Sequence, residues 1–242
     1  SVHFCDQDNL MSTIIDTFIA PTCHDKIEYL YQDEHLLVIN KPSGLLSLSG
    51  KNPQNIDSVH YRLVPLFPEC TLVHRLDFGT SGVMVIALNK AINRALCQQF
   101  SQRTVTKAYD ALLCGHLQND SGVIEAPIAK DPQHFPRMSI STTQGKAARS
   151  YYQVIERFYQ TLADGTRLPL TRVRLTPETG RTHQLRIHCQ YIGHPILGCD
   201  LYGGLLLSGT EHTPRLMLHA CELHFIHPVS EQPMDIYLPS PF

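Results

Sequence analysis

The sequence predicts an α+β fold with a mixed, mainly antiparallel sheet and flanking helices. Three observations favour this class. Short apolar or alternating segments, which are typical of strands, occur along most of the chain; only three segments space their apolar residues as helices do; and no segment is repeated. With 242 residues, the chain is long enough to bury a substantial core.

Each element follows from a local pattern. We expect strands at residues 36–40, 83–88, 109–114, 147–158, 172–176, 215–226 and 234–238. We expect helices at residues 56–66, 90–102 and 182–192. Residues 116–146 are rich in Pro, Gly, Asp and Ser, so we interpret them as a hairpin or an excursion over the sheet. We expect residues 1–28 to form an acidic N-terminal extension and residues 29–242 to form one folded domain.

The ends and faces of these elements can also be predicted. Asp57 or Ser58 begins the first helix, Asn89 caps the second, and Gly193 ends the third. The third helix has an apolar stripe, with Arg186 placed beside it; the stripe consists of Leu185, Cys189 and Ile192. In the strand at 172–176 the arginines are expected to face outward, while Val173 and Leu175 face inward.

Cysteine and histidine usage argues against a metal site. The eight cysteines are scattered without a C-x-x-C pair, so we expect reduced thiols rather than disulfides or zinc ligands. Among the 14 histidines, His219 and His224 lie five residues apart on an expected strand, which places them on opposite faces. The sequence has no long apolar span and no secretory leader, so we expect a soluble cytoplasmic protein without membrane partners.

Charge is distributed unevenly along the chain. The net charge is −2, yet residues 36–199 hold 18 basic and 10 acidic residues. Half of all basic residues fall within 130–190, where they are either ordinary solvated side chains or contacts to a phosphate backbone. These residues are Lys130, Arg137, Lys146, Arg149, Arg157, Arg167, Arg172, Arg174, Arg181 and Arg186.

The segment 73–82 places polar residues directly before a strand without charge, at 83–88. His74, Arg75 and Asp77 therefore lie at the edge of a buried sheet, where sites are commonly built. The alternative is a plain loop in which Asp77 only caps a turn and Arg75 is solvated.

Residues 74–82, which read His-Arg-Leu-Asp-x-x-Thr-Ser-Gly, resemble the signature of the RluA-type pseudouridine synthases. Five further blocks occur in the family's order, at residues 31–45, 107–109, 179–188, 193–200 and 215–220. The spacing is most similar to the short enzymes that modify both ribosomal and transfer RNA and lack an S4 domain. The resemblance implies the pseudouridine synthase fold with a central RNA-binding cleft.

The resemblance also implies the reaction, which breaks the bond from C1′ to N1 of uridine and joins C1′ to C5. This isomerisation needs no cofactor. Asp77 is the expected nucleophile or charge stabiliser. Arg186 is expected to hold the Asp77 carboxylate ionised, because burial alone would raise its pKa. Tyr109 is expected to stack on the displaced uracil or to take part in proton transfer.

Further residues are candidates for substrate binding. Arg75 is expected to enter the space left by a flipped uridine. Leu185 either lines the uracil pocket or packs in the core, and His74 either contacts phosphate or packs in its loop. Arg181, Lys107 and Lys41 are candidates for contacts to the RNA backbone.

The sequence leaves two alternative functions open. The first is an RNA-binding protein of the same fold without catalysis, whose signature would be a substitution at Asp77, Tyr109 or Arg186. The second is a different enzyme, such as a hydrolase, that uses Asp77 with His74 or His183 as an acid–base pair. The intact motif and the basic middle of the chain favour a pseudouridine synthase that acts on structured RNA. Because the chain has the size of a single-domain enzyme, we expect a monomer.

Overall fold

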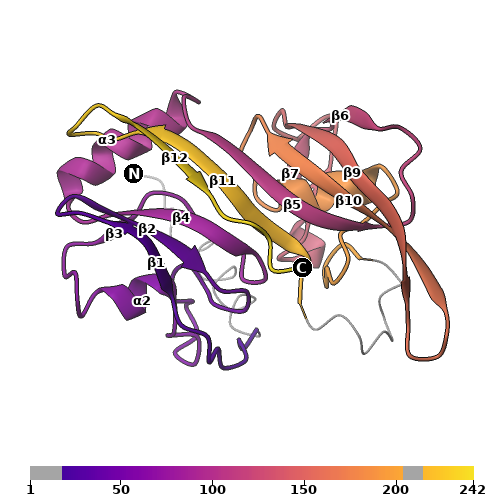
Figure 1. Ribbon diagram of the computed structural model, residues 1–242, viewed down its shortest axis with the longest axis horizontal. Coiled ribbons are helices and arrows are strands. Elements are labelled where there is room, and N and C mark those ends of the chain that lie inside the picture. The colour runs from indigo at the N-terminus through magenta and orange to yellow at the C-terminus, as the bar shows by residue number, and fades with distance from the viewer. Residues whose placement is uncertain (1–17, 204–214) are drawn as a thin grey trace, which may run out of the picture.

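The computed structural model describes residues 18–203 and 215–242 (Figure 1). Its strands are β1 (Glu28–Gln32), β2 (Leu36–Lys41), β3 (Thr71–Leu72), β4 (Ser81–Ala87), β5 (Thr106–Cys114), β6 (Ser121–Glu125), β7 (Ile128–Lys130), β8 (Met138–Ile140), β9 (Arg149–Thr161), β10 (Arg167–Pro177), β11 (Leu218–Ile226) and β12 (Pro233–Tyr237). Its helices are α2 (Val59–Leu63), α3 (Lys90–Ser101), α4 (Gln184–Tyr191) and the 3-10 turn η1 (Pro132–His134).

One large sheet organises the fold. Its strand order is β1-β2-β4-β11-β5-β10-β9-β6, with β12 paired to β11 and β3 paired to β4. Among the described residues, β4 and β11 form the only parallel pair of this sheet. This arrangement confirms the predicted mixed, mainly antiparallel sheet with flanking helices.

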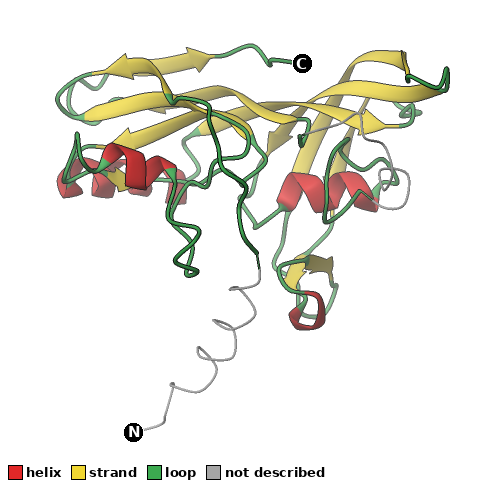
Figure 2. Ribbon diagram, turned by 90° about the horizontal axis from the view of Figure 1, so that it is seen from below, coloured by secondary structure: helices red, strands yellow, loops and turns green. Residues whose placement is uncertain are grey.

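The core is built on both faces of this sheet. Every residue of β4 is buried, as its uncharged sequence predicts. Met84 and Ile86 belong to the larger core, which also contains Val59 and Leu63 of α2. Val83 and Val85 point to the other face, where they pack with Ile92 and Leu96 of α3. Helix α4 lies beneath the β5–β10 part of the sheet, and the β7–β8 hairpin projects further on that side (Figure 2).

The helices differ from expectation at their ends. Asn89 caps α3 as predicted, because its Oδ1 accepts a hydrogen bond of 3.0 Å from the Ile92 N–H. Ser58 caps α2, but this helix covers only residues 59–63 rather than 56–66. Pro65 explains the early end: Val64 is still helical at φ −55° and ψ −40°, but Pro65 has no N–H with which to donate the next hydrogen bond of the helix.

Several strands are longer than their sequence patterns indicate. The strands expected at 109–114, 147–158 and 172–176 are β5, β9 and β10, which extend further because their ladders continue to the hairpin ends. Residues 116–146 are only partly an excursion, because β6 joins the main sheet beside β9. The predicted faces of β10 are confirmed: Val173 and Leu175 are buried.

The prediction for the two C-terminal histidines was wrong. β11 has an irregular register between Ala220 and Glu222. As a result His219 lies opposite Asp110 and His224 opposite Thr106, which are four residues apart on β5 and therefore share a face. The two rings bind separate partners: His219 contacts Ser81, and His224 contacts Asp235.

Residues 18–27 run along the body without a helix or strand. The Asn55 side chain hydrogen-bonds Phe18 O and Ala20 N, and the Arg62 guanidinium donates to the carbonyls of Cys23 and Asp25. The domain boundary after residue 28 stays a prediction. Among the described helices, none has the length and apolar character to cross a membrane.

Candidate active site

The loop that carries Asp77 connects β3 to β4, and hydrogen bonds from Ser47, in the segment before α2, hold it in place. Ser47 Oγ donates to Leu76 O at 2.7 Å and accepts from Leu76 N at 3.1 Å. The Thr80 N–H donates to Asp77 O, which closes a turn at the end of the loop. Gly82 adopts φ +123°, and an added Cβ would lie 2.3 Å from Ala220 O, so only glycine fits where β4 begins.

Lys41 is fully buried, so its predicted contact with an RNA backbone was wrong. Its ammonium instead donates to the carbonyls of Pro42, Leu45 and Phe78 at 2.8, 2.7 and 3.2 Å. Burial lowers the pKa of Lys41 to about 7, against the attraction of Asp77. Three carbonyl acceptors match the three donors of the ammonium, and the contact with Phe78 O fixes the residue after Asp77.

Arg186 joins two carboxylates. Its Nη1 lies 3.1 Å from Oδ2 of Asp77, its Nη2 lies 3.0 Å from Oδ1 of Asp200, and its Nε lies 3.3 Å from the Cys199 sulfur. Burial opposes the charge of Arg186, but Cys199 and Asp77 outweigh it and raise the pKa of the guanidinium. The cation is therefore permanent and holds one carboxylate oxygen of Asp77 in a fixed direction.

Arg186 reaches Asp77 because of the way α4 is placed. The predicted apolar stripe packs in the core, and Arg186 beside it is buried as well, at 7% exposed, as are all residues from Gln184 to Cys189. The reason is that α4 is covered on several sides, by the sheet and by residues 199–202. Before it, His183 occupies the left-handed region at φ 56°. A non-glycine residue in this conformation stores strain of about 1–3 kcal/mol and is often found at functional sites.

Tyr109 lies on β5 opposite Leu175, on the face of the sheet that α4 covers. Its ring is buried, and burial, followed by the charge of Asp77, raises the pKa of its phenol above the ordinary value. The phenol therefore stays protonated at neutral pH. It can donate a hydrogen bond or a proton but cannot act as a phenolate base.

Seven of the nine predicted site residues, all except His74 and Lys41, line one small pocket of about 110 Å³. They are Arg75, Asp77, Lys107, Tyr109, Arg181, Leu185 and Arg186. The pocket also contains His183, which the sequence suggested only as part of a rival acid–base pair. The segments that meet here are the loop before β4, the start of β5, and the turn that leads into α4.

A larger groove of about 970 Å³ adjoins this pocket and shares Arg75, Asp77, Lys107 and Arg181 with it. Its charged lining adds Arg103 and Glu178, so the described lining has more cationic than anionic side chains. Burial lowers the pKa of Lys107, whose Nζ lies 5.8 Å from the centre of the Phe100 ring. This basic groove gives the small pocket an open approach for an anionic polymer.

His74 takes the packed position of its two predicted alternatives. Its Nε2 accepts a hydrogen bond of 3.1 Å from the Val85 N–H, and its ring stacks on Phe100 at 4.9 Å. Burial, with a smaller contribution from Lys107, lowers the pKa of His74 to about 3. A neutral ring whose Nε2 is occupied by backbone is suited to holding the loop against β4.

The basic residues at 130–190 do not form one surface. Arg172 and Arg174 lie on the face of the sheet that does not carry Tyr109. There Arg174 forms a bidentate contact with Glu222. Arg157 forms an ion pair with Asp120 at 2.8 Å. Of this group, Arg181 and Arg186 line the small pocket. Arg157, Arg172 and Arg174 show that a count of basic residues overestimates the size of an RNA-binding surface.

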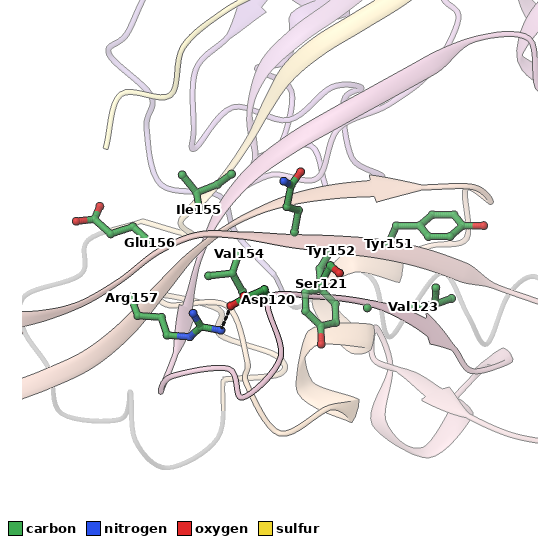
Figure 3. Close-up of a pocket in the computed structure, with 11 residues that line it drawn as sticks. Asp120, Ser121, Val123, Tyr151, Tyr152, Val154, Ile155, Glu156 and Arg157 are labelled. Carbon is green, nitrogen blue, oxygen red and sulfur yellow. Dashed lines mark ion pairs between the residues drawn. The ribbon is translucent and has the colours of Figure 1, made fainter.

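A second hollow, of about 830 Å³, lies along β6 and β9 (Figure 3). Asp120 and Arg157 at its rim neutralise each other, as the dashed contact in Figure 3 shows. Its other side chains are mainly aliphatic and tyrosine residues, with Glu156 as the one further charged group. The described residues also contain no group of three His, Cys, Asp or Glu side chains arranged to hold a metal. We therefore place the candidate active site at Asp77.

The fold and the cleft define this chain as a member of the pseudouridine synthase class. Its structure is similar to that of Human RNA Pseudouridylate Synthase Domain Containing 1, with a TM-score of 0.75 and 32% identity over 92% of this chain and 86% of that one. Human RNA Pseudouridylate Synthase Domain Containing 4 matches with a TM-score of 0.65 and 25% identity, over 97% and 93% of the two chains.

Sequence comparison narrows the class to a family. The profile described as RNA pseudouridylate synthase matches residues 35–191. The Dual-specificity RNA pseudouridine synthase RluA of Yersinia pestis is 46% identical over 85% of this chain and 95% of its own length. The protein of the same name from Escherichia coli (strain K12) is 41% identical over 88% and 93%. The chain belongs to the RluA family of RNA pseudouridine synthases.

Proposed function

We propose that this protein converts specific uridines to pseudouridine in structured RNA, in stem-loops of large-subunit ribosomal RNA, of transfer RNA, or of both. The observation that carries the proposal is the pocket that brings Asp77, Tyr109 and Arg186 together at the end of a basic groove. The dual-specificity enzymes that share its family support both RNA classes as substrates.

Asp77 is proposed as the group that acts at C1′ of the target nucleotide. Arg186 orients its carboxylate through the contact of 3.1 Å. The carboxylate either attacks C1′ or stabilises its positive charge while the bond to N1 breaks. After the base turns, C5 bonds to C1′, the hydrogen of C5 leaves as a proton, and N1 gains one. No electron enters or leaves the substrate overall.

Tyr109 is proposed to support the base and to move a proton in the last step. Its ring can stack on uracil at the pocket wall, and its raised pKa keeps the hydroxyl proton available. A phenol that carries its proton suits proton donation, or a relay in which it donates while accepting the C5 proton, better than simple base catalysis.

Access to the pocket requires the target uridine to leave its stack, which costs roughly a few kcal/mol. Arg75 is exposed and lies at the pocket and the groove together, so it can occupy the vacated position in the RNA. Leu185 is proposed to contact the flipped base, whereas Arg181 and Lys107 are proposed to contact the backbone.

The test is tritium release from RNA labelled with uridine-5-³H, because the C5 hydrogen leaves only when the new bond forms. Ribosomal and transfer RNA from cells that lack their own RluA-type enzymes serve as separate substrates. Wild type is expected to release tritium and Asp77→Asn to release none. Asp120→Asn is the matched control, since this exposed carboxylate pairs with Arg157 away from the groove. No release by wild type, with RNA binding retained, would leave the non-catalytic RNA-binding alternative.

We propose also that the protein acts as a monomer in the cytoplasm, where both RNA classes are present. Light scattering of the purified protein is expected to give a mass near 27.3 kDa, and twice this value would reject the monomer.

A further inference from the structure

Tyr202 lies behind Arg186 and is 1% exposed, although nothing in its sequence pattern suggested a function. It follows Cys199 and Asp200, the two residues that bind Arg186 together with Asp77. Its position therefore places a large aromatic ring directly beside the cation of the candidate active site.

The ring of Tyr202 contacts two guanidinium groups. The carbon centre of Arg186 lies 5.4 Å from the ring centroid, and that of Arg137 lies 5.5 Å from it. Both distances permit cation–π attraction, which is strongest where water is excluded. Arg186 is thus held by the ring as well as by the two carboxylates. Arg137 comes from the segment between η1 and β8, so the ring also contacts the β7–β8 hairpin.

The hydroxyl of Tyr202 links the hairpin to the residue before α4. It accepts a hydrogen bond of 2.7 Å from the Met138 N–H, and it lies 2.9 Å from Nδ1 of His183. Because the amide can only donate, the phenolic proton is free to be donated to His183. Burial lowers the pKa of His183, so its neutral ring carries the proton on Nε2.

Both residues reached by the hydroxyl are close to the cleft. His183 lines the small pocket and the groove. Pro136, two residues before Met138, lines a third hollow of about 520 Å³ that also contains Asp77, His183 and Arg186. The hydroxyl therefore determines where the hairpin and the imidazole lie with respect to Asp77.

We propose that Tyr202 is a positioning residue with two separable functions: its ring holds Arg186 against Asp77, and its hydroxyl fixes the hairpin and His183 for RNA binding. The proposal rests on the proposed function, because it concerns the RNA affinity and the chemical rate of that reaction. It assigns the hydroxyl to substrate affinity and the ring to the rate of the chemical step.

The test compares Tyr202→Phe with Tyr202→Leu in the tritium-release assay. Tyr202→Phe keeps the ring and is expected to raise KM for RNA about 10-fold, with a single-turnover rate at saturating RNA within about 3-fold of wild type. Tyr202→Leu also removes the ring and is expected to lower that rate by a further 10-fold or more. Tyr237→Phe, at an exposed tyrosine of β12, is the control for loss of a hydroxyl.

A double variant separates positioning from general support of the fold. If the hydroxyl acts through His183, then Tyr202→Phe is expected to change KM much less in a His183→Ala background than in wild type. Equal effects in both backgrounds would overturn the assignment of the hydroxyl to His183, and a lowered single-turnover rate with unchanged KM would overturn its assignment to RNA binding. A Tyr202→Leu rate equal to that of Tyr202→Phe would overturn the assignment of the ring. Absence of release by wild type would instead reject the proposed function itself.

Discussion

Nη1 of Arg186 lies 3.1 Å from Oδ2 of Asp77, although the two residues are 109 positions apart in the chain. The contact forms because the loop before β4 and the first turn of α4 meet beneath the sheet. The same guanidinium binds Asp200, so one buried cation is shared by two carboxylates. Asp77 is 34% exposed, which leaves part of its carboxylate open to the pocket. Arg186 therefore binds one oxygen of the carboxylate and leaves the rest of the group accessible to a substrate.

Substitution of Arg186 is expected to lower activity more than stability. Arg186→Gln removes the cation, and Arg186→Lys replaces the fork with a point charge that cannot reach Asp77, Asp200 and Cys199 together. Both variants are expected to lower the single-turnover rate by about 100-fold or more, because Asp77 loses its orientation.

The matched control for Arg186 is Arg174→Gln. It breaks an arginine–carboxylate contact of the same type, with Glu222, on the opposite face of the sheet. Arg174→Gln is expected to lower the melting temperature slightly and to leave the single-turnover rate within about 2-fold of the wild-type rate. A wild-type rate in Arg186→Lys would contradict the orienting role.

Tyr109→Phe tests the phenolic proton and keeps the ring. If the protonated phenol takes part in the last proton transfer, then loss of the hydroxyl is expected to slow turnover by about 100-fold. RNA affinity, measured by filter binding, is expected to stay within about 3-fold, because the ring still lines the pocket. Tyr109→Leu should weaken binding as well. Full activity of Tyr109→Phe would limit Tyr109 to stacking.

Arg181 and Arg172 provide a matched pair for the RNA-binding surface. Arg181 lines the groove, whereas Arg172 lies on the other face of the sheet, where its guanidinium is 5.8 Å from the Phe242 ring centroid. Arg181→Ala is expected to weaken RNA binding and to reduce the slope of log affinity against log salt by about 1. Arg172→Ala should leave that slope unchanged. Equal slopes for all three proteins would exclude a phosphate contact by Arg181.

Asp33 is expected to make stability depend on acidic pH. Burial alone would raise the pKa of its carboxyl, but hydrogen bonds lower it to about 2; the donors are the side chains of Tyr31 and His227 and the backbone amides of His35 and Leu36. Because the folded pKa lies below the unfolded one, the stabilisation is complete above about pH 4 to 5 and is lost as the pH falls towards 2.

Urea unfolding of wild type and Asp33→Asn measures this contribution. Their difference is expected to be about 1 to 2 kcal/mol at pH 6, allowing for partial exposure of the carboxyl, and to shrink steadily below pH 4. Asp25→Asn changes an exposed carboxyl before β1 and is expected to show no such trend. A difference that is constant between pH 6 and pH 3 would contradict the assignment to Asp33.

Local patterns predicted the elements better than they predicted their ends. The uncharged run of β4 and the Asn89 cap of α3 depend on neighbouring residues, and both were correct. The helix expected at 56–66 was too long: the apolar spacing continues to Leu66, but Pro65 cannot donate the hydrogen bond that would extend the helix. The irregular register of β11 could not be predicted, because it depends on pairing with β5 rather than on the residues of β11 itself.

The residues of the candidate site also fall into those that sequence motifs predicted and those that only tertiary contacts identify. The motif around Asp77 and the block that contains Arg186 were recognisable as sequence, and both contribute to one pocket. Lys41 was a candidate for contact with the RNA backbone, whereas three backbone carbonyls bind its buried ammonium here. Asp200 and Tyr202 were missed, since each gains its importance from the approach of Arg186 in space.

By itself, the sequence determined the fold class, the family and the residue types available for catalysis, because these depend on local composition and on short motifs in a fixed order. Only the tertiary structure decided which charges face the groove, which are neutralised on the far side of the sheet, and which side chains hold Arg186 in place. The physical reason is that burial, pairing and pKa depend on distances between residues that are far apart in the chain.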